Sequence, residues 1–244
     1  DGWKELEFRN IGYTYPDGTV ALNKINATIT RNDFVGITGP SGSGKTTLLM
    51  ILLGLIEPTE GEMILDGTPL SGPDALRRWQ NGIGYVPQGL FIIDGSIADN
   101  VAFGDANPDL ERVQEAAEMA QLGEYLREQP DGVLDQVGEY GALLSGGQKQ
   151  RVVIARALYR DPDLIAFDEA TAALDVESER GLTDYLATFK SEKTMLAIAH
   201  RITTIKHCDK ILYLEAGRLG GFAPFDELKR DSQGFANLAA LSNL

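Results

Sequence analysis

One glycine-rich stretch, Gly39–Thr46, limits what this chain can fold into more than any other feature. It reads G-P-S-G-S-G-K-T and fits G-x-x-x-x-G-K-[ST], between a predicted strand at 34–38 and a predicted helix at 45–53. Glycines let the backbone curl so that several N–H groups face one centre, and the helix N-terminus adds about half a positive charge. Lys45 can reach the β- and γ-phosphates, and the Thr46 hydroxyl can ligate Mg²⁺. The stretch therefore predicts a nucleoside triphosphate site rather than a flexible turn.

Two carboxylates follow another apolar run. Leu164–Phe167 is predicted to be a strand, and Asp168 and Glu169 come directly after it. Ligands of open parallel sheets bind at the carboxyl ends of the strands. Beside a phosphate loop, Asp168 suits Mg²⁺ binding and Glu169 suits deprotonation of an attacking water, although alone the pair would fit a solvated acidic loop equally well. His200 follows the predicted strand 194–199 and is expected at the γ-phosphate or the water, whereas a single histidine is usually structural.

A second glycine-rich turn opens a predicted helix further along the chain. Ser145-Gly146-Gly147-Gln148 fits S-x-x-Q, a capping box in which the serine and glutamine side chains cap the first turn. The box does not explain the paired glycines, since each costs about 1 kcal/mol against alanine in a helix. Glycine leaves the backbone open to a ligand that approaches closely. One triphosphate, however, leaves little room for two complete phosphate-binding turns from the same copy of the chain. We therefore expect this turn to close over the γ-phosphate held by a second copy of the protein.

The order of the predicted elements indicates an α/β fold. Strands that alternate with helices favour a largely parallel sheet, and the helical character between 91 and 161 favours an inserted subdomain. Apolar or alternating runs predict strands at 6–15, 20–29, 34–38, 63–65, 83–86, 164–167, 194–199 and 210–215. Helices are predicted at 45–53, 109–120, 176–190, 225–229 and 235–241, besides the one opened by Ser145.

Composition excludes several classes of protein. The 244 residues carry a net charge of −14, so no global positive field favours nucleic acid or anionic lipid, and a bound anion needs local positive groups. The single cysteine, Cys208, excludes an internal disulfide and is interpreted as a buried, inert thiol. The longest apolar run, Leu48–Ile56, is far shorter than the roughly 20 residues that span a bilayer. With no signal peptide, the sequence predicts a soluble, cytosolic piece.

These motifs occur in an order that resembles the ABC (ATP-binding cassette) family along nearly the whole chain. Gly39–Thr46 resembles the Walker A loop, Leu144–Gln148 the signature L-S-G-G-Q, and Leu164–Asp168 the Walker B strand. Gln88 resembles the Q-loop glutamine that senses Mg²⁺ and the transmembrane partner, and Asp175 lies in a D-loop that communicates across the dimer. Glu169 takes the position of the catalytic base and His200 that of the switch histidine. Tyr15 occupies the place of the aromatic that stacks on adenine, with strand packing as its alternative.

The resemblance implies an α/β fold with a P-loop NTPase (RecA-like) core, a mostly parallel sheet, an N-terminal antiparallel β part and an inserted helical subdomain. It implies one domain over 1–244, with a catalytic core of about 1–88 and 162–244 and a helical signature subdomain of about 89–161. Two such domains meet head to tail around two MgATP, most simply as a homodimer. The implied catalytic residues are Lys45, Gln88, Glu169 and His200, and the implied Mg²⁺ ligands are Thr46, Gln88 and Asp168. The nucleotide-binding set is Tyr15, Gly39, Pro40, Ser41, Gly42, Ser43, Gly44, Lys45, Thr46 and Thr47, and the set that reaches the partner's ATP is Ser145, Gly146, Gly147 and Gln148.

Other segments resemble exporter cassettes. Gln136–Gly141 resembles the X-loop, and Phe91 with Ser96–Asn100 is also exporter-like. Leu90–Ile93 is expected to form a docking surface for a membrane domain, or else to pack in the core. The abrupt start suggests a domain excised from behind a fused membrane domain, although a separate subunit fits too. Ala199–Leu219 faintly resembles bacterial flippases of lipid-linked oligosaccharides.

Three alternatives remain open at this point. Peptide or toxin exporters share most of the same pattern. A soluble ABC ATPase that acts on ribosomes or DNA would use the same motifs, but the acidic composition and the X-loop-like segment disfavour it. A regulatory module that binds ATP without turnover is disfavoured by Glu169, His200 and the signature.

Near the C-terminus, Ala223–Leu228 departs from the G-x-H-x-E-L of many relatives, which leaves the role of the tail open.

Overall fold

The computed structural model describes residues 2–168, 192–199 and 205–241, and the chain divides into two compact units. The first unit contains Asp1–Asn81 and Leu186–Leu244, and the second contains Gly82–Tyr185. The predicted helix at 176–190 lies outside the described residues. The predicted boundaries of a helical subdomain at about 89 and 161 stay a prediction.

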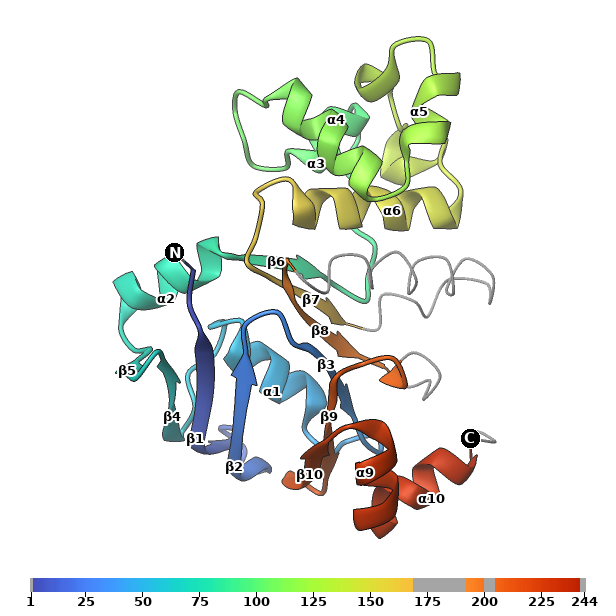
Figure 1. The fold of residues 1–244 in the computed structure, drawn as a ribbon. Helices are drawn as coiled ribbons and strands as arrows, with labels where there is room; N and C mark the ends of the chain where they lie inside the picture. The colour runs from blue at the N-terminus through green and yellow to red at the C-terminus, as the bar shows by residue number, and fades with distance from the viewer. Residues whose placement is uncertain (1, 169–191, 200–204, 242–244) are drawn as a thin grey trace. The chain divides into compact units, whose positions relative to one another are not determined.

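An antiparallel sheet in the first unit has the strand order β2-β1-β4-β5 (Figure 1). Its long strands alternate buried and exposed side chains, as half-buried strands do, and Leu6, Phe8 and Ile29 point into the core. The strand β1 pairs with both β2 and β4, so it is an internal strand of this sheet. The bounds are Glu5–Thr14 for β1, Val20–Thr30 for β2, Glu60–Leu65 for β4 and Thr68–Pro69 for β5.

A second set of strands in the first unit leads to the phosphate loop. The strand β3 (Phe34–Thr38) runs parallel to β8 (Thr194–Ile198) on one side and to β9 (Lys210–Glu215) on the other. Every residue of β3 and β8 is buried, which is typical of parallel strands covered on both faces. The strand β10 (Arg218–Ala223) pairs antiparallel with β9. Cys208 is buried, as predicted.

The helices described in the first unit are α1 (Lys45–Leu52), α2 (Pro73–Asn81), α9 (Phe225–Asp231) and α10 (Gln233–Leu241). The helix α1 follows the phosphate loop directly. The indole N–H of Trp79 in α2 donates to the carbonyl of Leu52 at 2.6 Å and so joins α2 to the end of α1. Gly54, at φ 68°, ends the α1 segment as the sequence predicts.

The second unit combines two parallel strands with a group of helices. The strand β6 (Ile83–Val86) pairs in parallel with β7 (Leu164–Asp168). The helix α6 (Gly146–Leu158) packs against α3 (Ile97–Val101), α4 (Leu110–Met119) and β6, and Figure 1 shows α3, α4 and α5 gathered on one side of it. The remaining elements are α5 (Gly123–Glu128) and the short 3-10 turns Gly132–Leu134 and Glu139–Gly141.

The predicted fold class is confirmed, since the described strands form a parallel set and a separate antiparallel sheet within an α/β fold. Some elements were not predicted from the sequence, among them α2, β5 and β10. The helix α2 buries only Trp79 and is mostly polar, so few apolar residues mark it as a helix that faces the core. The strand β10 contains Gly220 and Gly221, which are poor strand formers. Among the described residues, no helix has both the length and the apolar character to cross a membrane.

Candidate functional site

The loop between β3 and α1 has a backbone that only glycine permits at two points. Gly39 has φ 151°, and a Cβ there would collide with the carbonyl oxygen of Leu214. Gly44 has φ 99°, and a Cβ there would lie 2.6 Å from the carbonyl oxygen of Ala21. These glycines therefore hold the curl of the loop, as the sequence motif predicts.

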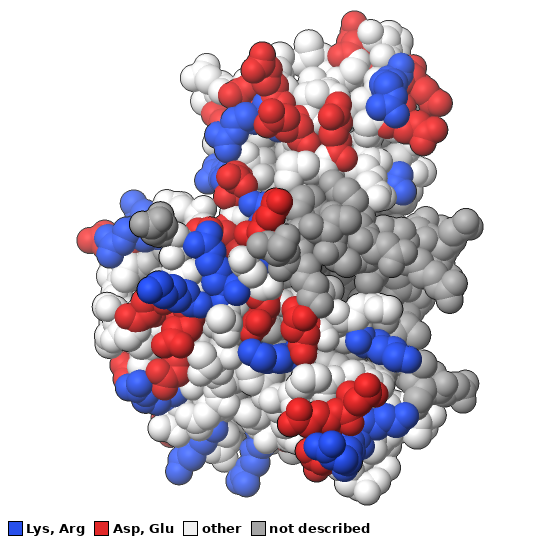
Figure 2. All heavy atoms as spheres, in the orientation of Figure 1, with Lys and Arg blue, Asp and Glu red and all other residues white. Residues whose placement is uncertain are grey.

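Lys45 is the cation of this loop. Its side chain is buried at 7% exposure, and its Nζ donates to the carbonyl oxygens of Gly39 and Pro40 at 2.9 Å each. The ammonium therefore lies within the curve of the loop instead of extending into solvent. On the face drawn in Figure 2, lysines and arginines lie among aspartates and glutamates. Since the net charge of the chain is −14, a bound anion depends on local positive groups such as the Lys45 ammonium.

The start of α1 is suited to an anion. No side chain of the described residues caps it, and its first turn contains no acidic residue. A helix N-terminus of this kind presents N–H groups and a partial positive charge. The Ser43 hydroxyl oxygen, one residue before the N-cap, is buried and has no hydrogen-bond partner in the described structure. Both observations fit a loop that binds a phosphate chain.

Tyr15 lies beside this loop. Its hydroxyl oxygen is 2.8 Å from the hydroxyl oxygen of Thr47, in the first turn of α1. Tyr15 is 41% exposed, and its ring meets that of Tyr13 edge-on at a centroid distance of 5.0 Å. The exposed face of this ring, which is hydrogen-bonded to α1 through Thr47, is available to an adenine ring. The hydrogen bond between the two hydroxyls was not predicted from the sequence.

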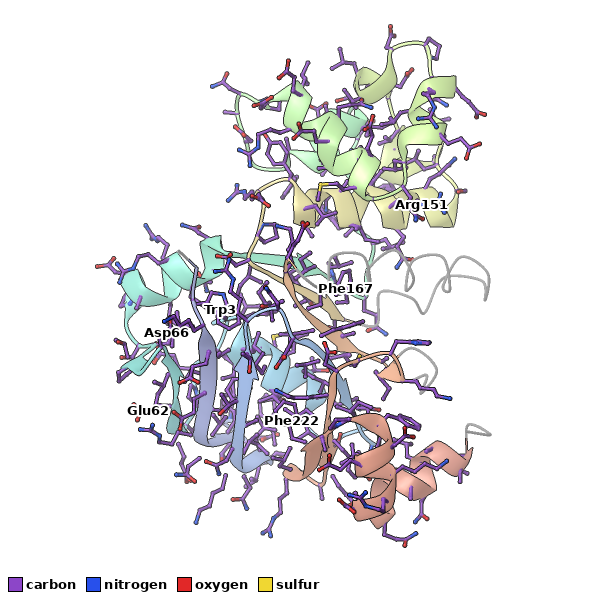
Figure 3. The ribbon with its side chains drawn as sticks, viewed as in Figure 1. Trp3, Glu62, Asp66, Arg151, Phe167 and Phe222 are labelled. Atoms are coloured by element: carbon purple, nitrogen blue, oxygen red, sulfur yellow. The ribbon has the colours of Figure 1, made fainter. Side chains whose placement is uncertain are left out.

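In the second unit, Asp168 ends β7 and is 9% exposed (Figure 3 labels its neighbour Phe167). The hydroxyl of Tyr85 in β6 donates to its Oδ2 at 3.1 Å. Burial, the charge of Asp168 and this hydrogen bond together raise the pKa of Tyr85 to about 12. Tyr85 therefore stays neutral and orients the carboxylate. Sequence reasoning missed this role, although the parallel register of Tyr85 with Ala166 brings it close to Asp168.

The start of α6 contains the predicted capping box. The Gln148 N–H donates to Ser145 Oγ at 3.2 Å, and the Ser145 N–H donates to Gln148 Oε1 at 2.8 Å. Ser145 and Gly146 are exposed. A Cβ added at Gly146 or Gly147 would meet no atom within 4 Å, and neither glycine has a positive φ. The described part of the chain therefore gives no reason for glycine at either position.

The structure brings part of the predicted set together. Residues 39–47 and Tyr15 share the first unit, whereas Gln88, Asp168 and Ser145–Gln148 belong to the second. Within the second unit Gln88 is exposed after β6. Glu169, Asp175 and His200 lie outside the described residues. The three predicted Mg²⁺ ligands, Thr46, Gln88 and Asp168, are thus split between the units.

Comparison with known proteins gives a consistent result. A family model described as "ABC transporter" matches residues 22–172 of the chain. An ATP-dependent lipid A-core flippase of Cupriavidus pinatubonensis is 40% identical over 228 residues, which make up 92% of this chain and 38% of that protein. A toxin RTX-I translocation ATP-binding protein of Actinobacillus pleuropneumoniae is 39% identical over 233 residues, or 94% of this chain and 32% of that protein. The chain therefore spans less than two fifths of the length of these curated relatives.

A solved structure is similar over the entire chain. It is described as a bacterial Atm1-family ABC exporter with ATP bound, and it aligns with a TM-score of 0.88 at 32% sequence identity. The alignment covers 100% of this chain and 43% of that one. The likeness thus extends beyond the strands and loops of the phosphate site to all parts of the chain.

Proposed function

Because the chain belongs to the ABC transporter family, we propose that it is the ATP-binding and ATP-hydrolysing domain of an exporter. The observation that carries this proposal is the phosphate loop: glycines required by its backbone, Lys45 inside its curve and an uncapped α1 behind it. Its relatives are named as an ATP-dependent flippase and as a translocation ATP-binding protein. ATP is accordingly the expected ligand.

The proposed reaction is in-line attack of water on the γ-phosphate. The loop N–H groups and Lys45 bind the phosphates and stabilise the charge that develops on them. Glu169 deprotonates the water and His200 orients it. Thr46, Gln88 and Asp168 offer hydroxyl, amide and carboxylate oxygens, which are the hard donors that Mg²⁺ takes, and the ion when bound neutralises phosphate charge. Tyr85 holds the Asp168 carboxylate in place through its hydroxyl.

A second copy of the chain is proposed to complete each site. The glycines of Ser145–Gln148 are needed by nothing in the described part of the chain, so their bare backbone is best explained by a ligand on another molecule. Ser145 accepts from the Gln148 N–H and still has its own O–H to donate to a phosphate oxygen. Asp175 is proposed to communicate across the same interface.

The relatives support the assignment to an exporter. In this proposal the domain lies at the cytoplasmic face of a membrane and is joined to a membrane domain. The identities to a lipid A-core flippase and to a toxin exporter are 40% and 39%, so they do not separate these two classes of cargo. We favour flipping of a lipid or a lipid-linked oligosaccharide, because the first relatives are named as flippases. The second candidate is peptide or toxin export.

The experiment that tests this proposal is phosphate release by the purified chain as a function of its concentration. If two copies form each site, the rate per molecule should fall on dilution, because the closed dimer dissociates. A rate per molecule that is independent of dilution would overturn the shared site. Absence of ATP-dependent phosphate release at any concentration would favour a binding module without turnover, and co-purification with nucleic acid would favour the soluble ATPase.

A further inference from the structure

Arg156, on the buried side of α6, is bound by a surface segment far away in sequence. Its Nε donates to the carbonyl of Asn100 at 2.7 Å, and its Nη2 donates to Asn100 Oδ1 at 3.2 Å. Its Nη1 donates to the carbonyl of Phe91 at 2.9 Å. The guanidinium also lies over the ring of Phe103, 5.2 Å from its centroid. One side chain of α6 thus contacts three points of the segment 91–103.

Asn100 connects the parts of the segment 91–103 through hydrogen bonds. It is fully buried, and its Nδ2 donates to the carbonyls of Ile93 and Ser96 at 3.0 Å each. Its Oδ1 accepts from the Ile93 N–H at 2.9 Å. A capping box between Ser96 and Asp99 fixes the start of α3 within the same segment. Movement of Arg156 is therefore transmitted to the whole segment through Asn100 and Phe91.

The outer side of the segment carries two exposed aromatic rings. Phe91 is 55% exposed and Phe103 is 47% exposed, and their rings meet edge-on at a centroid distance of 5.9 Å. We call these two residues the aromatic pair. Arg156 bonds the backbone of the first ring's residue and stacks on the second ring, so the geometry of the pair depends on it.

The opposite end of α6 begins with Gly146, directly after Ser145. From Gly146 to Arg156 is about three turns of helix, and a helix of this length moves as a stiff rod. A shift at the Ser145–Gln148 turn therefore displaces the guanidinium. Lysine cannot replace it, because an ammonium lacks the planar fork that bonds two carbonyls and one amide oxygen at once.

We propose that Arg156 is a positioning residue that couples the aromatic pair to the Ser145–Gln148 turn through α6. The coupling rests on the proposed function in one respect, that ATP engages this turn in a dimer. Binding at either end then changes the geometry of the other end. Arg156 itself touches neither nucleotide nor water in this scheme.

The test places a reporter in the aromatic pair. F91W keeps the backbone carbonyl that accepts from Arg156, and E169Q is expected to hold the ATP-bound dimer. Subtraction of the E169Q spectrum without F91W removes the emission of Trp3 and Trp79. We expect ATP to change the reporter emission, and we expect R156K to reduce that change at least threefold while the dimer still forms. R151K is the matched control, because Arg151 lies on the same helix (Figure 3) and donates a long hydrogen bond of 3.5 Å to the carbonyl of Gln121, outside the segment 91–103.

An unchanged reporter response in dimeric R156K would overturn the coupling, as would an equal loss in R151K. If R156K does not fold, F103L takes its place, since that ring is half exposed and its loss removes the contacts with the Arg156 guanidinium and with the ring at position 91 but leaves the hydrogen bonds of Arg156; an unreduced response there would also overturn the coupling.

Hydrogen exchange on the monomeric chain without ATP separates this inference from the proposed function. We expect R156K, or F103L if needed, to speed amide exchange in both 91–103 and 145–150, whereas faster exchange in 91–103 alone would overturn the coupling. A parent that fails to dimerise with ATP would count against the proposed function, and the exchange result would still decide the coupling.

Discussion

The hydroxyls of Tyr15 and Thr47 lie 2.8 Å apart, and their hydrogen bond joins the segment between β1 and β2 to the helix that follows the phosphate loop. The aromatic ring is otherwise 41% exposed. The bond therefore restricts the ring before any ligand arrives and places it at a fixed position relative to the loop. This pre-positioning has a measurable consequence for nucleotide affinity.

Tyr15→Phe should weaken ATP binding by about two- to tenfold, since a neutral hydrogen bond contributes about 0.5–1.5 kcal/mol. The ring surface remains, so any loss comes from the freed side chain. The measurement is the Kd for ATP by equilibrium dialysis. Tyr13→Phe is the matched control, because it removes a hydroxyl from the adjacent ring without touching Thr47. Equal affinities for Tyr15→Phe and the unmodified chain would show that the bond does not position the ring.

Glu169→Gln should keep ATP binding and slow phosphate release by about 10²–10⁴-fold, the usual contribution of a general base. Because hydrolysis would release the two copies, the variant should also accumulate as an ATP-dependent dimer. Sedimentation velocity with and without ATP measures the dimer, and a phosphate assay measures turnover. Near-normal turnover would remove Glu169 from the proposed role.

Gly147→Ala should have opposite effects on folding and on assembly. The added Cβ meets nothing in the described structure, so the folded chain should become more stable by about 0.4–1 kcal/mol through reduced freedom of the unfolded state. The same methyl group should block close approach of the partner's nucleotide and prevent the dimer in the Glu169→Gln background.

Gly123→Ala is the control for assembly, since Gly123 opens α5 and belongs to no predicted site. A Cβ there would lie 3.3 Å from Glu118 Cγ, so no gain in stability is expected from it. Urea unfolding and sedimentation with ATP give the two readouts. A Gly147→Ala variant that dimerises normally would contradict the role given to the paired glycines.

Tyr85 should make stability depend on alkaline pH. Its pKa is raised to about 12 in the folded chain, above the value of about 10 for an unfolded tyrosine. The folded state then holds the proton more tightly, so the contribution is complete below pH 10 and is lost as pH rises toward 12. Urea midpoints over this range should fall more steeply for the unmodified chain than for Tyr85→Phe. Parallel curves would contradict the shift.

Much of the fold follows from local pattern. The run 34–38, which is apolar up to Thr38, precedes the phosphate loop and coincides with β3, because a strand buried on both faces has an almost continuous series of apolar residues. The start of α6 follows from the S-x-x-Q pattern, since a capping box is a local interaction. These elements could be predicted because nothing distant in the chain decides them.

Long-range contacts could not be predicted in this way. An arginine on a helix is ordinarily exposed, yet the partners of Arg156 lie 56 and 65 residues away in sequence. The bond between Tyr15 and Thr47 spans 32 residues, and the bond between Tyr85 and Asp168 spans 83. Each depends on strand register and helix packing, which a single sequence does not specify. The roles of Glu169, Asp175 and His200 stay predictions.

The two glycine-rich helix starts differ in how they are completed. The side chains of Ser145 and Gln148 cap the first turn of α6, whereas no side chain in the described part of the chain caps α1. The first turn of α6 is thus stabilised by its own side chains, whereas the first turn of α1 depends in part on a bound anion. When nucleotide dissociates, the first turn of α1 should therefore be the first part of the protein to fray.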